Sequence, residues 1–404
     1  MCVLDHDLIR NLAQPQDTKI ILLVMDGLGG LPREKGGPTE LEAADTPNLD
    51  RLAAEGICGL SVPVRSGVTP GSGPGHLSLF GYDPTECVVG RGVLSALGIG
   101  FDLRPGDVAA RGNFCTLDDD GLVTDRRAHR ISGSESAPLV EKLNEIEIPG
   151  VEVFVRLVKD YRLLLVLRGE GLSGAIDNTD PQETGVPPKE PQALSPEAEE
   201  TAELVAQFLA AARDVLADHH SANGILMRGF STRPDWPSMQ DLFGLKAAAI
   251  ASYPMYRGVS RLVGMDILGD PHDLDEELDL LEEHWGAYDF FFVHVKPIDA
   301  AGEDGDFSRK VRAIEEADTR IPRIMELNPD VVVVTGDHST PSILRSHSWH
   351  PVPTLIWSAW CRSDGVTSFG ERPCMLGGLG PRLPATELMP IALANALRLE
   401  KFGA

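Results

Sequence analysis

The chain has little positive charge and no paired cysteines. It has 61 acidic side chains against 36 lysines and arginines in 404 residues, a formal net charge of −25. Such a surface disfavours binding to nucleic acid or anionic membranes, and it repels an anionic substrate unless metal ions or clustered arginines attract it. The six cysteines are scattered without a C-x-x-C pair, which is typical of reduced thiols in the cytoplasm.

Long hydrophobic runs are also missing. The longest, Ile20 to Met25, suits a buried strand and is too short to span a bilayer. The N-terminus lacks the apolar segment of a signal peptide, and no G-x-x-x-x-G-K-[ST] motif occurs, which weakly disfavours a kinase. We therefore predict a cytoplasmic protein without membrane or nucleic-acid partners. Its length suggests two or three domains, and the oligomeric state stays open.

Several short apolar runs are present, and they predict parallel strands buried on both faces. Three of them end close to an acid: residues 20–25 before Asp26, 288–295 before Asp299, and 331–334 before Asp337. Residues 354–357 indicate a fourth strand. Because α/β sheets bind ligands at the carboxyl ends of their strands, we expect the three acids to share one site.

Histidines accompany these acids. His338 adjoins Asp337, and His347 and His350 lie in the following loop. Mixed carboxylate and imidazole ligands suit Mn²⁺, Zn²⁺ or Co²⁺. A single aspartate after a strand is more often a turn or cap residue, but the whole set favours a metal centre.

A glycine- and proline-rich loop, residues 69–76, carries Ser72 between Gly71 and Gly73. Small neighbours let a phosphoryl group approach a serine oxygen closely. Serine is a poor nucleophile unless a base or a metal activates it, and a plain turn is the better interpretation of this motif alone.

Arginines are a third candidate set, because guanidinium groups bind carboxylate and phosphate oxygens. In an acidic chain they are equally compatible with solvated surface charges. Two adjacent arginines on a strand point to opposite faces, so only one of Arg126 and Arg127 need reach a substrate. The candidates are Arg111, Arg126, Arg127, Arg130, Arg228 and Arg257.

The order of these pieces resembles the alkaline phosphatase superfamily and, more closely, the archaeal type of cofactor-independent phosphoglycerate mutase. The resemblance covers nearly the whole chain. It is carried by VMDGLGGLP (24–32), TPNLDRLAAEG (46–56), TPGSGPGHLSLFGYDP (69–84), GRGVLSALGIG (90–100), DVAARGNF (107–114), DRRAHRIS (125–132), TGDHSTP (335–341) and HSWHPVP (347–353).

This resemblance implies an α/β core with a mostly parallel sheet, covered by helices on both faces. The core would comprise residues 1–89 and 244–404. An inserted α+β domain, residues 90–243, would bind substrate and act as a lid. The implied reaction is the glycolytic and gluconeogenic interconversion of 3-phosphoglycerate and 2-phosphoglycerate, without 2,3-bisphosphoglycerate.

It also implies roles for individual residues. Ser72 would carry the phosphoryl group, with Lys246 nearby. The ligands of one metal would be Asp26, Ser72, Asp337 and His338, and those of the other Asp299 and His347 with help from position 303. Mn²⁺ is favoured, with Mg²⁺, Co²⁺ or Zn²⁺ as alternatives. Substrate would be held by Arg111, Arg127, Arg130 and Arg228.

One segment departs from the family pattern. The second-metal motif usually reads Asp-x-x-x-His, but Glu303 stands in the histidine place, and an oxygen ligand favours harder ions. We hypothesise that Glu303 and His350 are exchanged partners that both bind the second metal; alternatively, His350 is an ordinary loop histidine.

Three rival functions stay open from the sequence. One is a phosphatase or sulfatase of the same superfamily, and another is a phosphomutase or homoserine-kinase-like enzyme for a different metabolite. The third is a non-catalytic metal-binding protein. The lid and arginine segments favour the mutase, and the joint presence of Ser72 and all the acids disfavours a lapsed site.

Overall fold

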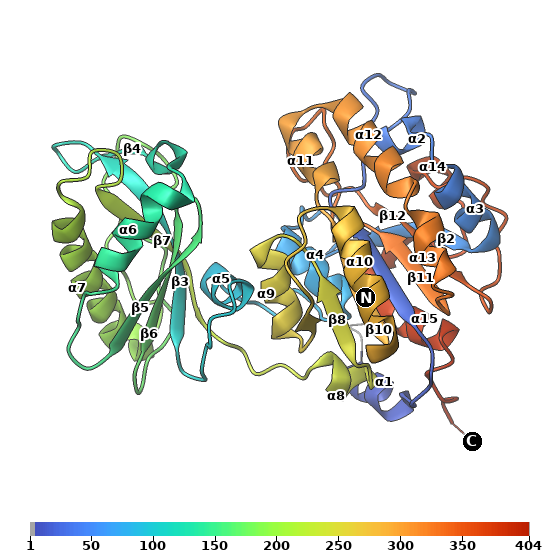
Figure 1. Ribbon diagram of the computed structural model, residues 1–404, viewed down its shortest axis with the longest axis horizontal. Helices are drawn as coiled ribbons and strands as arrows, with labels where there is room; N and C mark the ends of the chain where they lie inside the picture. Colours follow the sequence, from blue (N-terminus) through green and yellow to red (C-terminus); the bar gives the residue numbers. More distant parts are fainter. Residues whose placement is uncertain (1–4, 404) are drawn as a thin grey trace. The chain divides into compact units, whose positions relative to one another are not determined.

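The computed structural model describes residues 5–403, which form two compact units (Figure 1). Unit 2 is Val89–Asp235, and unit 1 contains the described residues on either side of it. The sequence pattern places the second boundary at 243/244, later than the structure does. Helix α8 (Met239–Phe243) belongs to unit 1 because it packs against α1 (His6–Leu12), where Arg10 Nε donates to the Asp241 carbonyl oxygen at 3.2 Å.

Unit 1 is built on an eight-stranded sheet. All neighbouring strands pair in parallel except β12, which runs antiparallel to both β11 and β2. The spatial order is β13 (Gly380–Pro384), β2 (Ile57–Val62), β12 (Val352–Ser358), β11 (Val331–Thr335), β1 (Ile20–Met25), β10 (Phe290–Val295), β8 (Ala247–Ile250) and β9 (Asp266–Ile267).

Helices cover both faces of this sheet. Every residue of β1, β10 and β11 is buried, as their unbroken apolar runs predict. Ile21, Leu23 and Met25 pack into one core with α3, α10, α12 and α13, whereas α9 and α15 contact the sheet outside that core.

The helices of unit 1 are mostly short. Besides α1 and α8 they are α2 (Glu40–Ala43), α3 (Pro47–Glu55), α4 (Ser72–Leu79), α9 (Pro254–Leu262), α10 (Leu274–His284), α11 (Pro297–Asp304), α12 (Phe307–Asp318), α13 (Ile321–Glu326), α14 (Glu371–Cys374) and α15 (Leu388–Asn395).

Unit 2 is an antiparallel α+β unit with its own core. Its sheet contains β4 (Val123–Asp125), β3 (Val108–Leu117), β6 (Arg162–Arg168) and β5 (Glu152–Lys159), with β7 (Gly224–Thr232) also paired to β3. Its helices are α5 (Arg91–Gly98), α6 (Gly133–Leu143) and α7 (Glu199–Leu216). Helices α6 and α7 supply Leu139 and Phe208 to the core below the sheet.

The mixed α/β architecture with a mostly parallel central sheet confirms the fold class expected from the sequence. Among the described residues, no helix combines the length and apolarity needed to cross a membrane.

Candidate active site

The carboxyl ends of three adjacent strands meet in unit 1. Strand β1 lies between β10 and β11, and both pair with it in parallel. Asp26 follows β1 directly, Asp337 follows β11 after one glycine, and Asp299 lies in the first turn of α11 behind β10. All three carboxylates are at most 1% exposed. The structure therefore brings the three acids together at the carboxyl ends of neighbouring strands, as expected from the sequence pattern.

The first cluster joins Asp26, Asp337 and His338, each of which offers a ligand atom within 4.8 Å of the others. His338 Nε2 lies 3.1 Å from Asp337 Oδ2 and 3.5 Å from Asp26 Oδ1. The Ser72 hydroxyl lies 3.2 Å from the same imidazole nitrogen. Ser72 is half-buried at the first position of α4, so its oxygen reaches the cluster from a different element.

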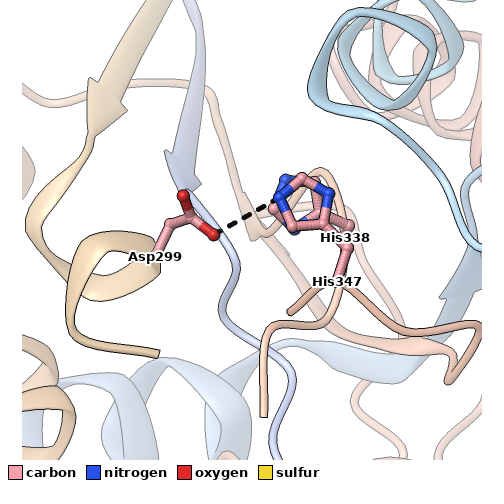
Figure 2. A group of neighbouring side chains, drawn as sticks. All are labelled: Asp299, His338 and His347. Atoms are coloured by element: carbon pink, nitrogen blue, oxygen red, sulfur yellow. Dashed lines mark ion pairs between the residues drawn. The ribbon is translucent and has the colours of Figure 1, made fainter. Parts of the chain in front are cut away.

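The second cluster contains Asp299, His338 and His347 (Figure 2). The two imidazole rings stack with centroids 3.5 Å apart, and His347 Nε2 lies 3.7 Å from Asp299 Oδ1. Glu303 Oε1 is 3.8 Å from His347 Nε2, one turn of α11 beyond Asp299. Thr340 links the clusters, because its hydroxyl donates to Asp299 Oδ1 at 2.7 Å and lies 2.9 Å from His338 Nδ1.

A cation and a phenol occupy the other side of Asp26. Lys296 Nζ lies 3.0 Å from Asp26 Oδ2 and 2.5 Å from Asp299 Oδ2. Tyr256 donates its hydroxyl to the same Asp26 oxygen at 2.5 Å, and His294 Nε2 lies 3.1 Å from it. These contacts were not predicted. The position of Lys296 directly after a buried strand was the only sequence signal, and Tyr256 gave none.

Nearby charges lower the pKa values of Asp26 and Asp337 despite their burial. Burial and Asp337 oppose ionisation of Asp26, but the His294 hydrogen bond and the charge of Lys296 keep its pKa below the usual value. Burial likewise opposes ionisation of Asp337, and the charges of His338 and His76 hold its pKa well below normal. Burial lowers the pKa of His338, but Asp337 and Asp26 outweigh it and raise the value to about 8.

The donor set fits divalent metal ions. Asp26 Oδ1 and Asp337 Oδ2 are buried without a hydrogen-bond partner, although buried carboxylate oxygens normally have one. Both belong to the first cluster, and ionised carboxylates with imidazoles are ligands that Mn²⁺, Co²⁺ and Zn²⁺ accept. Metal binding would satisfy both oxygens.

The structure does not bring Lys246 or His350 into these clusters. Lys246 immediately precedes β8 and is exposed over the Tyr288 ring, so it lies at the amino end of a strand parallel to β10, whose carboxyl end leads to Asp299. His350 instead lies 3.0 Å from the Ser348 hydroxyl and stacks against Trp349. The hypothesis of exchanged partners is therefore not supported for His350.

Arg257 lies on α9 of unit 1, where it pairs with Asp270 at 2.5 Å, whereas the other predicted arginines belong to unit 2. Arg111 and Arg228 stand opposite each other on β3 and β7, half-buried on the sheet. Arg127 and Arg130 are exposed after β4, where Arg130 has a positive φ of 58°. The Arg126 guanidinium binds Asp180 at 2.9 and 2.7 Å, and Arg228 Nη1 lies 3.7 Å from the same carboxylate.

The fold and the two clusters together define the class: an α/β protein with a mostly parallel sheet and a candidate metal-ligand set at the carboxyl ends of its strands. The sequence model described as 2,3-bisphosphoglycerate-independent phosphoglycerate mutase matches residues 53–222.

Relatives cover nearly the whole chain. A probable 2,3-bisphosphoglycerate-independent phosphoglycerate mutase of Thermus thermophilus is 53% identical over 401 residues, 98% of each chain. One from Aquifex aeolicus is 48% identical over 98% of this chain and 100% of its own. The chain therefore belongs to the family of 2,3-bisphosphoglycerate-independent phosphoglycerate mutases, which are isomerases.

Solved structures agree with this assignment. A protein from Pyrococcus horikoshii is 32% identical with a TM-score of 0.82, over 96% of this chain and 99% of its own. A cofactor-independent phosphoglycerate mutase from Thermoplasma acidophilum is 30% identical with a TM-score of 0.72, over 94% and 100% of the two chains.

Proposed function

We propose that the protein interconverts 3-phosphoglycerate and 2-phosphoglycerate through a phosphoserine at Ser72, with two divalent metal ions and without 2,3-bisphosphoglycerate, as a cytoplasmic step of glycolysis and gluconeogenesis. The single observation that carries this proposal is the Ser72 hydroxyl, 3.2 Å from His338 Nε2, the same nitrogen that lies 3.1 Å from Asp337 Oδ2 and 3.5 Å from Asp26 Oδ1. A serine with no role beyond forming a turn would not require a cluster of ionised side chains beside its hydroxyl.

Four residues would hold the first ion: Asp26, Ser72, Asp337 and His338. Asp299, Glu303 and His347 would hold the second. When bound, such ions activate a hydroxyl nucleophile and neutralise the charge of phosphoryl oxygens. Mn²⁺ is the ion we favour, since two of the three proposed second-site ligands are carboxylates.

Residues of the chain supply the rest of the chemistry. Ser72 Oγ attacks the phosphoryl group and carries it while glycerate reorients, and then returns it to the other hydroxyl. Lys296 offers a positive charge beside Asp26 and Asp299, and we assign it the phosphoryl-side role that the family resemblance implies for Lys246. Preorganised charge of this kind lowers the barrier to phosphoryl transfer.

Unit 2 would recognise the anionic substrate and exclude water. Arg111 and Arg228 lie side by side on its sheet, and Arg127 and Arg130 lie on an exposed turn. Guanidinium groups suit the carboxylate and phosphate of phosphoglycerate. Exclusion of water matters because water would otherwise hydrolyse the phosphoserine.

The test is an enolase-coupled assay with 3-phosphoglycerate and Mn²⁺, without 2,3-bisphosphoglycerate. Acid quenching during turnover followed by peptide mass spectrometry should find phosphate on Ser72. We expect S72A to lose at least about 10³-fold in kcat, as nucleophile removal does elsewhere, while it still binds Mn²⁺ at the second site. Ser78→Ala, on the same helix, is the matched control.

Two results would contradict the proposal. Wild-type turnover by S72A would refute the assignment of Ser72 as the nucleophile. Release of inorganic phosphate without 2-phosphoglycerate would favour the phosphatase.

A further inference from the structure

A buried lysine outside both metal clusters connects the loops that carry them. Lys310 lies on α12 and is 0% exposed. Its Nζ donates to the carbonyl oxygens of Gly27 at 2.9 Å, Gly29 at 3.0 Å and Thr340 at 2.9 Å. An ammonium group has three N–H donors and no acceptor, so every donor of Lys310 is used on backbone oxygen.

The three acceptors belong to the two loops that hold the first cluster. Gly27 follows Asp26, and Thr340 lies two residues after His338. The Gly27 peptide connects both sides, because its N–H donates to Asp337 Oδ1 at 3.2 Å while its carbonyl oxygen accepts from Lys310. The Thr340 side chain also contacts Asp299 and His338. Lys310 therefore bridges the two loops that carry candidate ligands, beside the direct hydrogen bonds from the Thr340 N–H to the Gly27 and Gly29 carbonyl oxygens at 3.3 and 3.0 Å.

Buried carboxylates hold the opposite, amide-presenting side of the same loops. Glu40 Oε1 accepts from the Ser342 amide at 2.8 Å, and its Oε2 accepts from the Leu31 amide at 3.0 Å. Glu371 accepts from the Gly30 amide at 2.8 Å. Loop carbonyls thus face the cation and loop amides face the anions. A neutral side chain at position 310 would remove the Lys310 hydrogen bond from the Thr340 carbonyl oxygen, whereas the Gly27 and Gly29 carbonyl oxygens would keep the Thr340 N–H as a donor.

Burial makes this arrangement costly to maintain. Burial lowers the pKa of Lys310, and the nearby charges of Glu40 and Glu371 act in the opposite direction. A buried ion pair is weak evidence for stability in itself. Its position between two ligand-bearing loops instead points to a role in the geometry of the site.

We propose that Lys310 is a positioning residue for the metal centre, which holds the Asp26 loop and the Asp337–His338 loop at the separation that metal binding requires. The inference rests on the proposed function only for the identity of the ligands. Partners behind the ligands commonly change metal affinity or activity by about 10–100-fold, and we expect an effect of that size here.

The test compares two buried cations. Lys310→Met keeps the approximate length of the side chain and removes its donors. The matched control is Arg398→Met, since Arg398 is 1% exposed and donates to the carbonyl oxygens of Gln16 at 2.5 Å and Thr18 at 2.8 Å, before the amino end of β1. Manganese binding to the full-length protein is measured by electron paramagnetic resonance without substrate, alongside kcat, KM and unfolding in EDTA.

We expect K310M to weaken Mn²⁺ binding about 10–100-fold and to lower kcat more than it changes KM. R398M should lose stability in EDTA but keep wild-type Mn²⁺ affinity. Equal losses of affinity in K310M and R398M, or wild-type affinity in K310M, would overturn the proposal.

A third variant covers the case in which K310M does not fold. Lys310→Arg keeps the charge, but its planar guanidinium cannot direct three donors from one atom. We expect weakened Mn²⁺ binding in K310R too, and wild-type affinity there would overturn the proposal by itself. Because metal binding is read without substrate, failure to convert 3-phosphoglycerate would refute the proposed function and leave this test intact.

Discussion

Replacement of Lys296 by methionine should damage both the stability and the activity of the protein, whereas the same change at Lys246 should do neither. Lys296 Nζ lies 3.0 Å from Asp26 Oδ2 and 2.5 Å from Asp299 Oδ2, and both acids are at most 1% exposed. Removal of one partner of a buried ion pair costs about 3–5 kcal/mol because the remaining charge is left uncompensated. Lys246 is exposed over the Tyr288 ring at 4.8 Å, a contact worth about 0.5–1 kcal/mol.

The effect of metal separates the contribution of Lys296 to charge balance from its contribution to catalysis. Ions bound by Asp26 and Asp299 would neutralise the same carboxylates, so saturating Mn²⁺ should return part of the stability that K296M loses in EDTA. It should not restore turnover, and we expect kcat to stay lower by about 10²–10³-fold, as for loss of one charge-stabilising group.

The assay combines urea unfolding, with EDTA and with Mn²⁺, and the enolase-coupled rate for both variants. Loss of turnover in K246M with normal stability and rate in K296M would refute the reasoning and return the catalytic role to Lys246.

Three further predictions concern other parts of the molecule. Arg126→Met should destabilise the protein by about 1.5–3 kcal/mol, since it removes two charge-assisted hydrogen bonds from buried Asp180, which keeps Arg228 at 3.7 Å. Arg127→Met, an exposed change, should stay within about 0.5 kcal/mol while KM rises, and equal urea midpoints for the two variants would contradict this. Glu303→Gln should weaken Mn²⁺ binding about tenfold or more, whereas His350→Ala should leave it unchanged in the same titration. Weakened binding in H350A with unchanged binding in E303Q would instead support His350 as a ligand. Treatment with EDTA should abolish turnover and lower the unfolding temperature, both recovered with Mn²⁺; full activity after dialysis against the chelator would exclude a metal requirement.

Local pattern accounts for the predicted acids that the structure brings together. Unbroken apolar runs identify strands buried on both faces, and parallel pairing brings their carboxyl ends to one edge. Asp26, Asp299 and Asp337 therefore follow from the sequence, because each lies within a few residues of a strand end. His338 follows from the sequence as well, because it is adjacent to Asp337.

The errors have an equally physical origin. Lys246 and Lys296 both lie next to buried strands, but Lys246 precedes β8 and Lys296 follows β10, so parallel pairing places them at opposite edges of the sheet. Sequence alone placed Arg126 and Arg127 on a strand, yet both lie beyond β4, and the partner of Arg126 is 54 residues away in a loop.

The sequence by itself determined the family, the strands and the acids at their ends, since these depend on residue order and on burial patterns that repeat over a few residues. Only the tertiary structure decided which cation approaches the acids, that Glu303 and not His350 lies beside His347, and that Lys310 joins the two ligand-bearing loops. Those contacts join residues up to 283 positions apart, and no local pattern encodes the direction in which a distant side chain points.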